Sequence, residues 1–148
     1  MDSWLELFDD ELAPIEAACA GAGPEALALC RDLDDDLWAL LLTQEYDGFP
    51  HIRALLPSVP EPAFQELWNG TSGVALAAQS KAFYVKLRER YATHSGLPLS
   101  DSRVLDFGCG WGRLTRFLAR DVHTGRALDR RTVGTLAPLL DPDLPPAV

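Results

Sequence analysis

The residues most able to do chemistry lie within positions 103–120, RVLDFGCGWGRLTRFLAR. An acid, Asp106, precedes three glycines at alternate positions, Gly108, Gly110 and Gly112. Glycines at this density let the backbone turn sharply and approach a ligand without an intervening Cβ. The N–H groups at the start of a following helix favour a negatively charged group. The segment therefore predicts a ligand-binding loop.

The elements that must hold this loop are a strand before it and a helix after it. The apolar run Val104–Phe107 predicts a short buried strand. The helix that follows is expected to turn its apolar residues inward and to carry Arg113, Arg116 and Arg120 on its outer side. A strand, a glycine-rich turn and a helix form the front of a βαβ nucleotide-binding unit.

The glycine spacing discriminates between cofactors. A dinucleotide fingerprint has the pattern G-x-G-x-x-G. Counted from Gly108 the sixth position is Arg113, and counted from Gly110 it is Thr115, so neither register fits. The spacing therefore disfavours a nicotinamide oxidoreductase.

The pattern Asp106-x-Gly108-x-Gly110-x-Gly112 resembles motif I of class I S-adenosylmethionine (SAM)-dependent methyltransferases. The longer string VLDFGCGWGRLTRFLARD is similar to a bacterial branch of that family, and the resemblance covers about residues 69–121. It implies an α/β fold, with a helical N-terminal region followed by the βαβ start of a Rossmann-like methyltransferase domain. It also implies SAM as the cofactor.

The resemblance implies a role for each residue of the pattern. Gly108, Gly110 and Gly112 would let the loop wrap the methionine part of SAM, with its carboxylate at backbone amides. Asp106 would lie near the ammonium group of the ligand, directly or through water.

Three further residues join the expected cofactor site. Cys109 is expected to be a small packing residue in the loop, and Trp111 a possible wall of the site. The family has a second acid that binds the ribose hydroxyls, and Asp129 lies 17 residues after Gly112. Whether Asp129 is that acid or a plain surface residue stays open, because Val122–Leu128 does not read as a convincing strand.

The chain before the loop reads as helical. Residues 3–6 have the form of a capping box, and Asp34–Asp36 are expected to begin a helix, because carboxylates complement a helix N-terminus. A long helix is predicted over 73–93. The face that it should bury is Leu76, Ser80, Phe83, Leu87 and Tyr91. We expect a helical N-terminal region over 1–68 and the N-terminal part of a methyltransferase domain over 69–148.

Composition and charge exclude several classes of protein. The net charge of −9 over 148 residues disfavours nucleic acid as the main partner. No apolar run approaches the ~20 residues that span a bilayer, and the acidic N-terminus lacks a signal sequence, so we expect a cytoplasmic protein with no membrane partner. The three cysteines and three histidines show no metal-ligand spacing, and no metal is expected.

Only 36 residues follow Gly112, fewer than a doubly wound sheet needs. We therefore expect an incomplete, truncated Rossmann-like domain, with a loose tail from about residue 138. A short strand with at most one neighbour exposes its edge. That edge is expected to invite a partner chain or self-association.

The expected function is transfer of a methyl group from SAM to an unidentified acceptor, most simply a small molecule. No catalytic base is assigned, although Tyr84, Tyr91, His94 and His123 are available. The alternative is a non-catalytic fragment or interaction module that binds SAM weakly or not at all.

Overall fold

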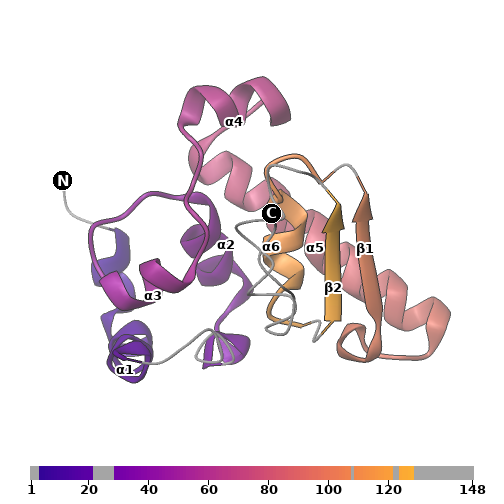
Figure 1. Ribbon diagram of the computed structural model, residues 1–148, viewed down its shortest axis with the longest axis horizontal. Helices are drawn as coiled ribbons and strands as arrows, with labels where there is room; N and C mark the ends of the chain where they lie inside the picture. The colour runs from indigo at the N-terminus through magenta and orange to yellow at the C-terminus, as the bar shows by residue number, and fades with distance from the viewer. Residues whose placement is uncertain (1–3, 22–28, 108, 122–123, 129–148) are drawn as a thin grey trace, which may run out of the picture.

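The structure is a computed structural model that describes residues 4–21, 29–107, 109–121 and 124–128. Its elements in chain order are η1 (Trp4–Phe8), α1 (Asp9–Cys19), α2 (Asp35–Thr43), α3 (Pro50–Leu55), α4 (Pro62–Asn69), α5 (Gly73–Ser95), η3 (Leu99–Asp101), β1 (Arg103–Phe107), α6 (Arg113–Leu118) and β2 (Thr124–Leu128). The chain before β1 is mostly helical, which confirms the predicted helical N-terminal region. In Figure 1, α1 and α3 lie at one end of the molecule, the two strands lie towards the other, and α2 lies between them.

Helix α2 begins where the three aspartates predict. The Asp34 carboxylate accepts a hydrogen bond from the backbone N–H of Asp36 at 2.7 Å, and so caps the helix. The residues that α2 buries are Leu37, Trp38, Ala39, Leu41, Leu42 and Thr43. Because almost the whole helix is buried, α2 lies at the centre of the core.

Helix α5 packs against α2 and α6, but on a different face from the predicted one. Its buried residues are Leu76, Ala77, Ser80 and Tyr84. The prediction is right for Leu76 and Ser80 and wrong for Phe83, which is 50% exposed. The buried face of α5 differs from the predicted one because α6 packs beside it. Tyr84 packs on Phe117 of α6, with ring centroids 5.6 Å apart, and this contact sets the rotation of α5.

One buried cluster runs through the described chain. It joins Leu12 of α1 and Trp38 of α2 to Tyr84 of α5 and Phe117 of α6. Helix α6 lies between α2 and the strands in Figure 1 and contacts both α2 and α5. The predicted division of the chain near residue 69 stays a prediction.

The two described strands, β1 and β2, form a parallel pair, with α6 in the connection between them. The register aligns Arg103 with Thr124 and Phe107 with Leu128. The strand predicted at 104–107 is therefore present and one residue longer. Sequence did not favour a strand over 122–128, and β2 departs from that expectation because pairing with β1 outweighs its low intrinsic preference.

The two faces of β1 differ. Val104 is half-buried against the core, whereas Leu105, which points to the opposite face, is 59% exposed. The strand thus leaves an apolar side chain, Leu105, uncovered on one face.

Several predictions fall on residues outside the described ranges. They concern the capping residue Ser3, the loop residue Gly108, the second acid Asp129 and the tail from about residue 138.

Candidate functional site

The acid of the predicted site, Asp106, lies near the carboxyl end of β1. Its side chain is half-buried, and its Oδ2 accepts a hydrogen bond of 2.6 Å from the Thr115 hydroxyl. Thr115 is a buried residue of α6, only 3% exposed. The helix after the loop therefore holds the carboxylate by one of its two oxygens.

The glycine loop closes in a tight turn before α6. The backbone N–H of Gly112 donates to the carbonyl of Cys109 at 2.9 Å, and the carbonyl of Gly112 accepts from Arg116 N–H at 3.0 Å. Gly110 and Gly112 have φ angles of 59° and 79°. Residues with a Cβ are strained at such angles, so the turn itself requires glycine at these two positions.

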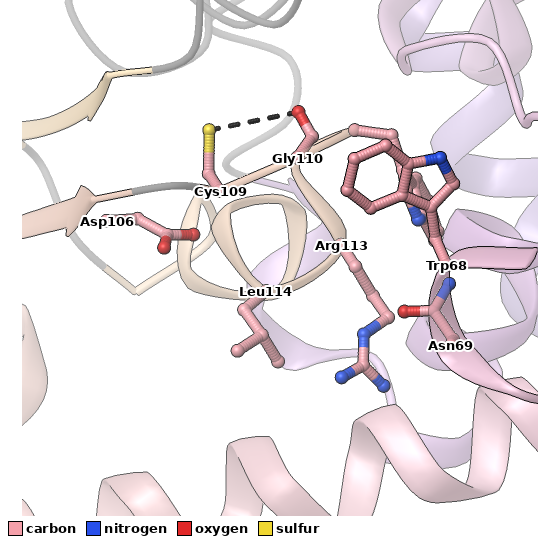
Figure 2. Close-up of a pocket in the computed structure, with 8 residues that line it drawn as sticks. Trp68, Asn69, Asp106, Cys109, Gly110, Arg113 and Leu114 are labelled. Atoms are coloured by element: carbon pink, nitrogen blue, oxygen red, sulfur yellow. Dashed lines mark hydrogen bonds between the residues drawn. The ribbon is translucent and has the colours of Figure 1, made fainter.

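A cavity of about 220 Å³ lies beside this turn. Its lining residues are Trp68, Asn69, Asp106, Cys109, Gly110, Trp111, Arg113 and Leu114. In Figure 2, Asp106 and Cys109 lie on one side of the turn, and Trp68 and Asn69 lie on the other. Four residues of the predicted cofactor site thus meet at one cavity, while Gly112 is buried at the start of α6.

Sequence reasoning did not place Trp68 and Asn69 at the site. They come from the end of α4, where Asn69 Nδ2 donates to the carbonyl of Gln65 at 3.0 Å. Gln65 is 2% exposed, and it also accepts from the Gly73 N–H at 3.3 Å, which fixes α4 to the start of α5. The only feature of the sequence that pointed to Asn69 was the start of the methyltransferase resemblance at about residue 69.

The outward direction expected of Arg113, Arg116 and Arg120 is wrong for Arg116 and Arg120, which are 5% and 4% exposed. Arg113 is half-buried, and its Nη1 donates to Gln79 Oε1 at 2.9 Å and to Ser80 Oγ at 3.3 Å. Burial lowers the pKa of Arg113. The physical reason is that α6 is short and packed between other helices, so long side chains bury their stems and reach polar atoms beyond the helix.

Arg120 enters a buried ionic network that the sequence did not reveal. Its guanidinium pairs with Asp35 of α2 and donates to the carbonyl of Leu33 at 2.8 Å. Arg88 of α5 pairs with the other Asp35 oxygen at 2.7 Å. Asp35 therefore links α2, α5 and the chain after α6, a role beyond helix capping.

Tyr84 belongs to the same network and lies apart from the cavity. Its hydroxyl donates to Asp121 and accepts from Arg88 at 3.2 Å. Burial, and then the hydrogen bond to Asp121, raise the pKa of Tyr84. Among the other predicted base candidates, His94 is exposed and His123 lies outside the described residues.

Within the described ranges, no three His, Cys, Asp or Glu side chains are placed to hold a metal ion. None of the helices in the same ranges is long and apolar enough to cross a membrane.

Comparison with known proteins adds no identification. No protein-family model matches the chain, and neither a curated protein nor a solved structure matches it significantly.

Proposed function

We propose that the chain carries the SAM-binding loop of a methyltransferase. The observation that carries this proposal is the position of Asp106 at the cavity, beside a turn in which Gly110 and Gly112 have positive φ. The same residues form the acid and glycine pattern that resembles motif I. The parallel order β1, α6, β2 is the one expected at the start of a Rossmann-like domain.

The charges at the cavity suit an amino-acid end of a ligand. Asp106 would face an ammonium group, and Arg113 would face a carboxylate, because each wall offers the opposite charge. At about 220 Å³ the cavity is smaller than the roughly 300 Å³ and above typical of ligand pockets. It therefore suits the methionine part of SAM, with the nucleoside part extending beyond it.

The backbone at Gly110 is open to close approach. A Cβ at this residue would meet no atom within 4 Å beyond its chain neighbours. The half-buried Trp111, which also lines the cavity, offers an aromatic wall next to this backbone. These features support contact between the loop and a bound cofactor.

The bound cofactor would supply an electrophilic methyl group on a sulfonium. The residues of this chain would bind and orient it, and correct orientation of two reactants provides a large part of the rate of such a transfer. The acceptor is proposed to be a small molecule, and no side chain of this chain is assigned as its base.

The alternative, a non-catalytic module, is favoured by one observation. Leu105 exposes 59% of its surface on β1, and the sheet described here has two strands. Such a sheet leaves apolar surface and strand edge for another chain.

The deciding experiment is calorimetric titration of the 148-residue chain with SAM, with NAD as a control ligand. Asp106→Asn keeps the shape of the side chain and its bond to Thr115 but removes the charge. Loss of a hydrogen bond to a charged group costs about 1.5–3 kcal/mol, so we expect the Kd for SAM to rise about 10- to 100-fold. Asp101→Asn, an exposed acid in η3, is the matched control and should leave the Kd unchanged. Failure of the folded wild-type chain to bind SAM would favour the non-catalytic alternative.

A further inference from the structure

Arg116 connects the glycine loop to a distant segment of the chain. Its guanidinium donates to the carbonyl of Trp111 at 3.2 Å and to the carbonyl of Ser58 at 2.9 Å. It also lies over the Trp111 ring, 4.8 Å from the ring centre. One side chain thus holds the loop by its backbone and by its aromatic ring.

This contact reaches both walls of the cavity. Ser58 lies shortly before α4, and α4 ends with Trp68 and Asn69. Trp111, which belongs to the loop, lines the same cavity. A change in the position of Arg116 would therefore change the spacing between the α4 side and the loop side.

The partners of Arg116 are unusual for a buried cation. In the described part of the chain it forms no ion pair, and its buried Nε has no hydrogen-bond acceptor. Burial, and then the positive charge of Arg53, lower the pKa of Arg116 to about 10, so it remains charged at neutral pH. Buried charges are normally paired, and one held only by neutral carbonyls adds little stability.

Arg120 provides the contrast within the same segment. It is as deeply buried as Arg116, yet its charge is met by Asp35. Arg120 thus serves the packing of the helices, whereas the side-chain hydrogen bonds of Arg116 to described residues go to the loop and to the segment before α4.

We propose that Arg116 is a positioning residue that fixes Trp111 and the glycine turn relative to α4, and so keeps the cavity in a shape that binds its ligand. The link to ligand binding rests on the proposed SAM site. The mechanical part, fixing the turn, can be tested without any ligand.

The test compares Arg116→Lys with Arg120→Lys in the full chain. Lysine keeps the positive charge and the aliphatic part of the side chain, but it lacks the planar guanidinium group that can donate to several carbonyls at once. Amide hydrogen exchange is followed at Gly112, whose N–H closes the loop turn, and at Trp38, whose N–H bonds Asp34 at the start of α2. We expect Arg116→Lys to speed exchange about tenfold at Gly112 and leave Trp38 unchanged, and Arg120→Lys to do the reverse. A tenfold change corresponds to about 1.4 kcal/mol.

Titration with SAM gives the second readout. We expect the Kd to rise about tenfold in Arg116→Lys and to stay constant in Arg120→Lys at a temperature where both are folded. Unchanged Gly112 exchange and unchanged Kd in Arg116→Lys would overturn the inference. If wild type does not bind SAM, the proposed function fails, and exchange at Gly112 still decides the role of Arg116.

A second variant covers the case in which Arg116→Lys does not fold. Trp111→Leu removes the ring contact and keeps the backbone carbonyl that Arg116 binds. Exchange at Gly112 should then rise about threefold, less than for loss of the whole contact. No change would overturn the proposed positioning through the ring.

Discussion

The two buried arginines near α6 show how the helical core and the glycine loop differ. At the core, Arg120 meets Asp35, which also pairs with Arg88. At the loop, among the residues that the structure describes, Arg116 meets only carbonyl oxygens and the face of Trp111. A cation with a carboxylate partner holds helices together, while a cation held by neutral groups fixes backbone positions with little net stability. Stability and the candidate site thus depend on different residues of the same segment.

Removing the carboxylate at the core should have the largest effect on stability. Asp35→Asn leaves Arg120 buried without a counter-charge. Breaking a buried pair costs about 3–5 kcal/mol, and because Asp35 keeps 23% of its side chain exposed we expect about 2–3 kcal/mol in the free energy of unfolding. Urea denaturation of the variant and the wild type measures this loss in the free energy of unfolding.

Asp36→Asn is the matched control for this variant. The neighbouring carboxylate pairs with Lys81, but its side chain is 67% exposed, so its loss should cost below about 1 kcal/mol. Equal losses for the two variants would contradict a special role for Asp35 in the core.

A smaller effect is expected at the loop. Gly110→Ala places a Cβ at φ 59°, where strain costs about 1–2 kcal/mol although the space is open. Gly70→Ala, at φ 73° after α4 and equally open, should cost the same in urea denaturation. The two should differ in SAM titration, where only Gly110→Ala raises the Kd. A similar Kd for SAM in the two variants would show that Gly110 takes no part in SAM binding.

The smallest effect on stability is expected at Glu16. Its carboxylate is an anion held mainly by neutral N–H groups, whereas Arg116 is a cation held by neutral carbonyls. The carboxylate accepts from the backbone N–H groups of His51 and Ile52 at 2.8 Å each, and from His51 Nδ1 at 2.7 Å. Burial alone would raise the pKa of Glu16, but these hydrogen bonds outweigh it and lower the pKa below 4.5.

The direction of the pH dependence follows from this lowered pKa. The folded state favours the ionised form, so the contribution is fully present above pH 4.5 and is lost as pH falls through the lower folded value. Glu16→Gln should cost about 1 kcal/mol at pH 7, as for a helix cap, and less at pH 3. Urea denaturation at both pH values measures this, and the exposed Glu11→Gln in the same helix is the control. A difference that stays constant with pH would contradict the assignment.

Sequence by itself determined the local features of this protein. Asp34 caps α2 because a carboxylate at that position can reach the N–H of Asp36. The turn after β1 follows from Gly110 and Gly112, which occupy backbone angles that other residues avoid. The strand at 104–107 and the acid near its end were predicted for the same reason, since each depends on neighbours along the chain.

Tertiary structure alone decided which side chains meet. The direction of Arg116 and Arg120 depends on the carbonyls and on Asp35 that distant segments bring to α6. Trp68 joins the cavity because α4 is fixed to α5 through Gln65. Local sequence sets backbone angles and caps, but the burial of a long or aromatic side chain depends on surfaces far away in the chain, and no local pattern specifies those.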